Sequence, residues 1–115
     1  MPDLLAQLGA LITLALGILG VVAPAKASEW VEISARTHPG PAEFRAIYGG
    51  LFVALGLVPL VTGADAAYLT TGLAWVSAAS GRVVSIFLDR SLDPRNWLAV
   101  GFEGGLGALC LLALL

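Results

Sequence analysis

Four long apolar runs, separated by short polar segments, dominate the pattern of hydrophobic and polar positions. A helix needs roughly 20 apolar residues to cross about 30 Å of hydrocarbon, and each run is close to that length. The pattern therefore predicts an all-α fold, an integral membrane four-helix bundle formed by a single domain, residues 1–115. The predicted spans are residues 4–23, 43–61, 66–88 and 96–115.

The longest polar connection, residues 25–42, follows the first span. Ser28 is a residue type that caps helices, and Trp30 and Ile33 after it would face one side of a short helix with charged residues on the other. Pro39-Gly40-Pro41 favours a turn back toward the membrane. We therefore expect a short interfacial helix in the first loop.

Composition supports a membrane protein and excludes several kinds of site. Hydrophobic residues make up 58% of the chain and charged residues only 12%, with a mean hydropathy of +0.91. Soluble domains carry about a quarter charged residues. A net charge of −2 with 6 Lys+Arg predicts no nucleic-acid partner. The lone Cys110 allows no disulfide within the chain, and Cys110 with the lone His38 predicts no metal site.

The positively charged residues predict the orientation in the membrane. With four spans, the termini and the turn at Asp65 share one side, and none of them carries Lys or Arg. The positive-inside rule then places the other two loops in the cytoplasm and both termini in the periplasm of a bacterial inner membrane. The N-terminus lacks the positive start of a signal peptide, so we expect a retained first span, with a cleaved signal as the alternative. The residues that determine this orientation are Lys26, Arg36, Arg45, Arg90 and Arg95.

Arg45, Arg82 and Glu103 are the most informative residues inside the predicted spans, because an ionisable side chain there costs several kcal/mol unless it is paired or reaches the interface. Arg82 and Glu103 each lie about seven residues, or roughly 10 Å, below the same interface. We predict that they form an ion pair between the third and fourth spans. Arg45, the third of these residues, enters from that side too, and two arginines with one deep carboxylate would leave a positive excess. The predicted polar network comprises Arg45, Tyr48, Arg82, Ser85, Asp89 and Glu103.

This network has two interpretations. In the first, it only locks the bundle, with Arg45 reaching the lipid headgroups and Tyr48 anchoring at the interface. In the second, it lines a pocket open to the cytoplasmic leaflet that binds a lipid headgroup, a quinone ring or a small anion. No catalytic arrangement of side chains is present, which favours a protein that is not an enzyme and needs no cofactor, although a bound quinone or lipid remains open.

Glycines at regular spacing predict close helix packing rather than contact with a ligand. Gly9, Thr13 and Gly17 lie four apart on the first span. The other glycines expected to pack helices are Gly49, Gly50, Gly81, Gly101, Gly104 and Gly105.

Three motifs carry a resemblance to a known family. They are E-F-R-A-I-Y-G-G-L-F-V-A-L-G at 43–56, G-R-V-V-S-I-F-L-D at 81–89 and F-E-G-G-L at 102–106. With them the chain resembles, over nearly its whole length, a bacterial family of four-span membrane proteins known as domain of unknown function 4345. That family is similar in fold to DoxX-type four-helix proteins, some of which work beside quinone-linked oxidoreductases. The resemblance implies a four-helix bundle and draws attention to Arg45, Tyr48, Gly49, Gly50, Gly81, Arg82 and Glu103.

These observations leave three functions open. The first is a non-enzymatic accessory or assembly subunit that packs against other membrane subunits or against itself, surrounded by membrane lipids. The second is a redox-accessory module that binds a quinone or a lipid headgroup through Arg45, Arg82 and Glu103. The third is a small transporter that works as a homo-oligomer.

Overall fold

The computed structural model describes residues 3–31, 42, 44–90 and 92–115 and is all-α throughout these ranges. Two short helical elements differ from α-helices: a π-helix (η1) precedes α4, and a 3-10 turn (η2) follows α6. The elements are α1 (Leu4–Val22), α2 (Pro24–Val31), η1 (Arg45–Leu51), α4 (Phe52–Thr62), α5 (Asp65–Leu88), α6 (Pro94–Leu111) and η2 (Leu112–Leu114).

Four of these helical segments are long and apolar enough to cross a membrane. They are Leu4–Val22, Arg45–Thr62, Asp65–Leu88 and Pro94–Leu114. Their bounds lie within a few residues of the predicted spans, so the membrane four-helix architecture is confirmed. The longest dimension of the molecule is 42 Å, more than the roughly 30 Å of a hydrocarbon core.

The short helix after the first span is also present, but it starts earlier than expected. Helix α2 begins at Pro24, directly after α1 ends, so Ser28 is at an interior position of the helix and not at its start. Proline suits a first helical position because its missing N–H has no partner to lose there. The predicted turn at Pro39–Pro41 and the position of Ile33 lie outside the described residues.

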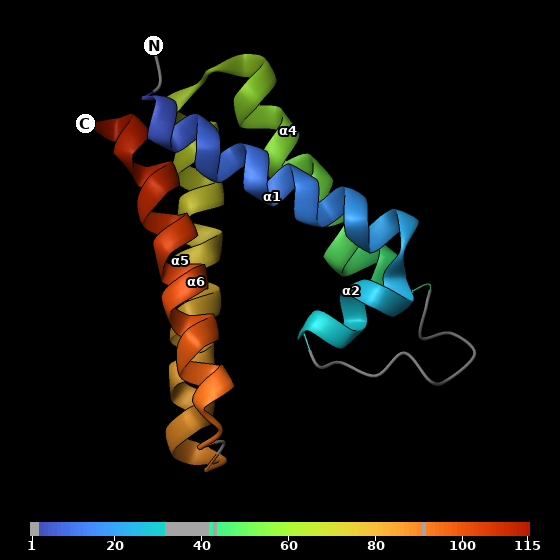
Figure 1. Cartoon of the computed structure of the whole chain (residues 1–115). Coiled ribbons are helices and arrows are strands. Elements are labelled where there is room, and N and C mark those ends of the chain that lie inside the picture. The colour runs from blue at the N-terminus through green and yellow to red at the C-terminus, as the bar shows by residue number, and fades with distance from the viewer. Residues whose placement is uncertain (1–2, 32–41, 43, 91) are drawn as a thin grey trace.

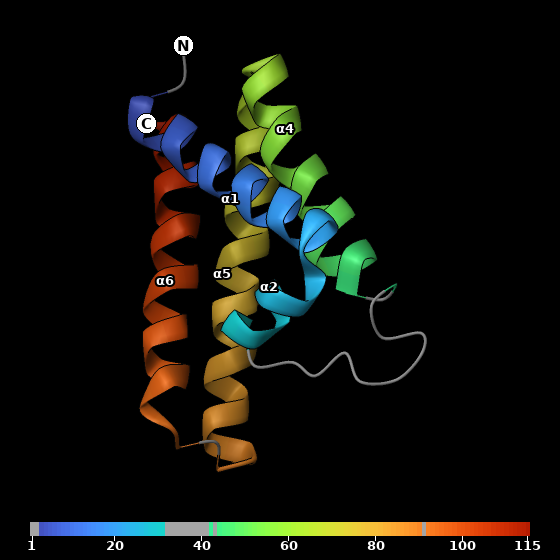
Figure 2. The same cartoon turned by 45° about the vertical axis from the view of Figure 1, so that its right-hand side comes forward.

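The spans pack as two pairs, α1 with η1 and α4, and α5 with α6 (Figure 1). Figure 2 shows the first pair inclined across the second. Glycines allow the close approach within each pair. A Cβ atom on Gly56 of α4 would collide with the α1 backbone, and Gly72 of α5 and Gly107 of α6 lie against each other in the same way.

The two pairs join at the end of the molecule that carries both termini (Figure 1). Tyr68 of α5 is fully buried there against Ala6 and Ala10 of α1. Slightly deeper, the indole N–H of Trp75 donates to the buried hydroxyl of Thr13 at 2.9 Å. The closely packed core therefore lies in the half of the bundle that carries both termini.

A proline inside α4 adds a second polar link between the pairs. Pro59 has no N–H, so it leaves the carbonyl of Leu55, four residues earlier, without its helical partner. The hydroxyl of Thr71 on α5 donates a hydrogen bond to that carbonyl. The kink-forming residue thus creates an acceptor that a neighbouring helix fills.

Candidate functional site

Away from the termini, the two helix pairs separate and enclose a cavity of about 590 Å³. This volume lies within the range of about 300–1,000 Å³ that is typical of small-molecule sites. Most of the wall is apolar, and its charged groups come from α5, from α6 and from Asp93, which caps α6. The lining residues are Leu16, Leu19, Ala27, Phe44, Tyr48, Phe52, Trp75, Ala78, Arg82, Asp93, Arg95, Asn96, Leu98, Ala99, Phe102 and Glu103.

Five aromatic rings form a continuous row along this wall. The rings of Phe44 and Tyr48 are stacked with centroids 4.7 Å apart, and Tyr48 meets Phe52 edge-on at 5.8 Å. Phe52 meets Trp75 at 5.1 Å, and Trp75 meets Phe102 at 6.4 Å. The row crosses from the first helix pair to both helices of the second, so it defines one face of the cavity.

The π-helix η1 presents the first part of this row. Phe44, Tyr48 and Phe52 are four residues apart, and the wide turn of the π-helix between them keeps all three rings on the cavity side. Gly49 lies on the other side of η1, where a Cβ atom would collide with Val21 of α1. Close packing of the glycine therefore holds the tyrosine ring in the cavity wall.

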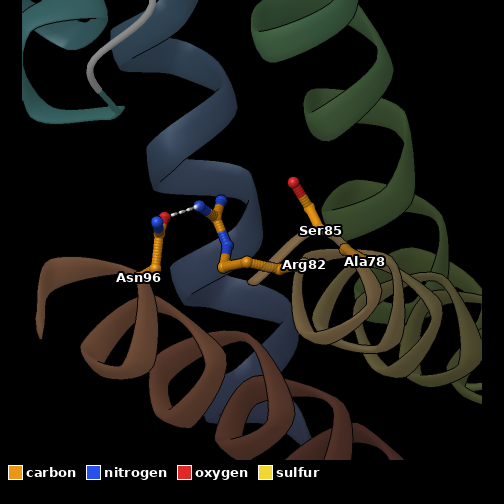
Figure 3. A pocket seen from close by; sticks show the side chains of 4 residues that line it. All are labelled: Ala78, Arg82, Ser85 and Asn96. Carbon is orange, nitrogen blue, oxygen red and sulfur yellow. Dashed lines mark hydrogen bonds between the residues drawn. The ribbon is translucent and has the colours of Figure 1, made fainter. Parts of the chain in front are cut away.

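Arg82 is the centre of the polar end. Its Nε donates to Oε1 of Glu103 at 2.9 Å, and its Nη2 lies 2.7 Å from the same oxygen. Its Nη1 donates to the side-chain oxygen of Asn96 at 3.1 Å (Figure 3). The predicted ion pair between α5 and α6 is thus confirmed, and Asn96 adds a neutral acceptor from about two turns before Glu103 on α6.

Some hydrogen-bonding groups of this ion pair have no partner among the described residues. Both contacts from Arg82 reach Oε1, so Oε2 of Glu103 is buried and has no hydrogen-bond partner in the described part of the chain. Arginine has five N–H groups, and its three close contacts with described residues, from Nε, Nη1 and Nη2, do not use all of them. A buried polar atom without a partner costs about 1–3 kcal/mol, which an ion pair selected only for stability would avoid.

A smaller pocket of about 230 Å³ adjoins the same guanidinium and is lined by Ala78, Arg82, Ser85 and Asn96 (Figure 3). The hydroxyl of Ser85 does not reach Arg82. It donates to Asp89 one turn further along α5, at 2.6 Å. Arg82 and Asn96 line both spaces, so they form the boundary between the large apolar cavity and this small polar pocket.

A second charged pair lines the cavity beside the loop between α5 and α6. Arg95 Nη2 lies 3.0 Å from Asp93 Oδ2, and Asp93 also accepts from the backbone N–H of Arg95, which caps α6. These hydrogen bonds from Arg95 lower the pKa of the Asp93 carboxyl below its ordinary value. Asp93 is therefore a carboxylate at neutral pH, and its charge offsets that of Arg95.

The predicted network is only partly assembled. Tyr48, Arg82 and Glu103 line the cavity, but Arg45 does not: it starts η1 with an exposed side chain. Ser85 pairs with Asp89 as a separate bond. The predicted positive excess is therefore wrong for the cavity, because the second arginine expected there points elsewhere.

Most of the predicted packing glycines make no close contact within the described chain, so their predicted role in helix packing stays a prediction. Gly49 packs closely, but no described atom lies within 4 Å of a Cβ built on Gly81, Gly101, Gly104 or Gly105, and Gly50 meets only the carbonyl of Arg45. Spacing of four places glycines on one face without saying which face meets a neighbour. The stripe on α1 was better predicted, since Gly9 packs on α6 and Gly17 on η1 and α4.

Several cavity residues were missed from the sequence. Asn96 was placed at the edge of a span and not in the network, and Trp75 was not among the predicted site residues. The spacing of Phe44, Tyr48 and Phe52 was the available signal, because rings four residues apart share a helix face. Phe102 beside Glu103 carries no comparable pattern.

The fold and the site define a small multi-pass helical membrane protein with a polar group buried between its helices. A comparison with protein families identifies the family of this chain. The family described as domain of unknown function (DUF4345) matches residues 3–114, and the chain belongs to it. No curated protein and no solved structure matches the chain. The wider similarity to DoxX-type proteins stays a prediction.

Proposed function

We propose that the protein is a non-enzymatic accessory protein of the bacterial inner membrane that binds an amphipathic small molecule, a quinone or a lipid headgroup, in the cavity between its helix pairs. The observation that carries this proposal is the combination of a cavity of about 590 Å³, a row of aromatic rings and a buried arginine at one end. Apolar walls with a few convergent polar groups are typical of ligand sites.

The unused polar capacity favours ligand binding over a purely structural lock. A structural ion pair gains most when both carboxylate oxygens and the guanidinium are fully hydrogen-bonded. Here Oε2 of Glu103 has no described partner, and Arg82 keeps N–H groups for a further acceptor. The position of Arg82 on the cavity wall makes these groups available to a ligand.

The proposal is tested by native mass spectrometry of protein purified in mild detergent, with identification of any retained quinone or lipid. The variants are Arg82→Ala, which removes the polar anchor, and Ala78→Phe, which fills the cavity that Ala78 lines. Ala108→Phe is the matched control, because Ala108 is exposed on α6 and is not among the cavity residues.

We expect the wild type and Ala108→Phe to retain the same small molecule and the other two variants to lose it. Retention of nothing small by the wild type, or equal retention by Ala78→Phe, would contradict the proposal. The mass of the retained molecule separates a quinone from a lipid.

Packing with other membrane subunits, or with a second copy, is the second candidate function. It is favoured by the glycines of α6 that no described atom covers, Gly101, Gly104 and Gly105. Small residues on a lipid-facing surface allow another helix to approach. Gly101→Leu with Gly105→Leu should then abolish any dimer or heteromeric mass in the same spectra, and an unchanged assembly would exclude this face.

A further inference from the structure

We infer that the head of the bound amphiphile is an uncharged, carbonyl-bearing ring rather than an anionic headgroup; this rests on the proposed binding function and specifies its ligand class. The inference depends on three features of the cavity: its balance of charges, the donors that remain on Arg82 and the aromatic wall.

The cavity is electrically balanced among its described residues. Four charged side chains line it, and they form two pairs, Arg82 with Glu103 and Arg95 with Asp93. Each pair is in direct contact, with nitrogen to oxygen distances of 2.7 and 3.0 Å. Among the described lining residues, no positive charge is left over for a phosphate or carboxylate, nor a negative one for an amine.

An added charge would be costly in this environment. Glu103 at the Arg82 end is only 7% exposed, and most of the remaining wall is apolar or aromatic, whereas the side chains of Arg95 and Asp93 are 66% and 47% exposed. Transfer of an ion from water to such a site is favourable only when a counter-charge is present. Since both arginines already have carboxylate partners, an anion at Arg82 would add an uncompensated negative charge close to Glu103.

A neutral carbonyl oxygen meets no such obstacle. It accepts a hydrogen bond from the N–H groups of Arg82 that neither Glu103 nor Asn96 uses, and it leaves the charge balance unchanged. Glu103 then acts as a positioning residue, because it neutralises and orients the guanidinium that touches the ligand.

The aromatic wall favours a flat ring next to that carbonyl. Tyr48, Phe52, Trp75 and Phe102 form consecutive ring contacts along the cavity. Rings gain from offset or edge-on contacts with other rings beyond simple burial. A saturated acyl chain would fill the space without using this geometry.

The same cavity also reaches the outer surface of α6, which gives the tail of an amphiphile a route to the bilayer. Phe102 and Leu98 line the cavity and are nevertheless 50% and 75% exposed. Both side chains therefore border the cavity and the surrounding hydrocarbon. A ring held at Arg82 leaves its alkyl tail beside these two residues.

Thermal stabilisation of the purified protein by three probes tests the inference, because a ligand that binds the folded state raises its stability by mass action. The probes are an alkyl naphthoquinone, its ring-hydroxylated analogue, which is an anion at neutral pH, and an uncharged acylglycerol with the same chain length. The wild type is compared with Glu103→Gln, which keeps a hydrogen-bond acceptor for Arg82 but removes the negative charge.

We expect the neutral quinone to bind the wild type about tenfold more tightly than its anionic analogue and more tightly than the acylglycerol. In Glu103→Gln the cavity gains a net positive charge, so this preference should reverse toward the anion. The wild-type comparison alone tests the inference if the variant does not fold.

Equal or tighter binding of the anion by the wild type would overturn the uncharged head while leaving the binding function intact. Tighter binding of the acylglycerol would overturn the ring. Stabilisation by none of the three probes would overturn this inference, while a lipid retained in the native mass spectra would leave the proposed binding function standing.

Discussion

At the scale of single residues, the pairing of Arg82 with Glu103 explains how a charged group lies in the middle of a predicted span. The carboxylate is almost completely buried, while about a third of the arginine side chain is exposed. The pair neutralises both charges, and the exposed part of the guanidinium faces the cavity. Its energetic role is therefore tested separately from ligand binding.

Replacement of Arg82 by leucine should destabilise the protein by about 2 kcal/mol, because it leaves the Glu103 carboxylate buried without a counter-charge. The double variant Arg82→Leu with Glu103→Leu should recover most of that loss, since no buried charge remains. Unfolding free energies of the wild type, both single variants and the double variant in one detergent measure the coupling. Additive effects of the two substitutions would contradict the ion pair.

The charge of Asp93 should contribute to stability only above acidic pH. Its pKa is lowered in the folded state by hydrogen bonds from Arg95, so the stabilisation is present above the ordinary pKa of 3.8 and is lost as the pH falls through the lower folded value. Asp93→Asn keeps a side chain that caps helices but removes this charge.

Melting temperatures of the wild type and Asp93→Asn should therefore differ at neutral pH and converge as the medium becomes acidic. Because all other carboxylates are common to both proteins, their titration cancels in the difference. A gap that stays constant or widens toward low pH would refute the assignment.

At the scale of elements, Thr71 compensates for the proline in α4. Thr71→Val should cost about 1–3 kcal/mol because it leaves the carbonyl of Leu55 without a partner between two packed helices. Thr70→Val is the matched control, since the hydroxyl of Thr70 bonds only to the carbonyl of Ala66 on its own helix and is exposed.

Thermal unfolding of the two threonine variants should show a clear loss for Thr71→Val and almost none for Thr70→Val. Equal losses would mean that the hydroxyl of Thr71 does not serve the carbonyl freed by Pro59.

The elements also show why some features were predictable from the sequence and others were not. The spans followed from apolar length alone, and the pairing of Arg82 with Glu103 followed from the cost of burying either charge at the same depth. Arg45 was wrongly included because equal depth does not fix the direction in which a side chain points around its helix. The direction depends here on η1, whose wider turn cannot be seen in the hydrophobic pattern.

The glycines of α6 that contact no described atom show the same limit of prediction from spacing. Gly101 and Gly105 have the spacing of a packing motif, yet α6 uses Gly107 for its contact with Gly72 of α5. Local spacing identifies a face that is able to pack, and the rotation of the whole helix decides which face does. That rotation depends on contacts far apart in the sequence.

At the scale of the whole molecule, all four spans alternate in direction and bring both termini to one end (Figure 1). The distribution of positive charge predicts that this end faces the periplasm. In a Cys110→Ala background, Ala64→Cys lies in the turn near the termini and Leu92→Cys in the opposite loop, and both positions are exposed.

A membrane-impermeant maleimide applied to intact spheroplasts should label Ala64→Cys and leave Leu92→Cys unlabelled until the membrane is permeabilised. The reverse pattern would show that the cavity opens toward the periplasmic half of the bilayer.

The separation of the two helix pairs is the feature from which the proposed function follows, since it creates a cavity in an otherwise solid bundle. Trp75 lies at its wall and reports on its contents. With Trp30→Phe and Trp97→Phe as background, the fluorescence of Trp75 alone should be quenched saturably by an alkyl naphthoquinone. Ala78→Phe should abolish the saturable phase and Ala108→Phe should preserve it. Quenching that rises linearly and equally in all three proteins would show only partition into the detergent and would contradict a binding cavity.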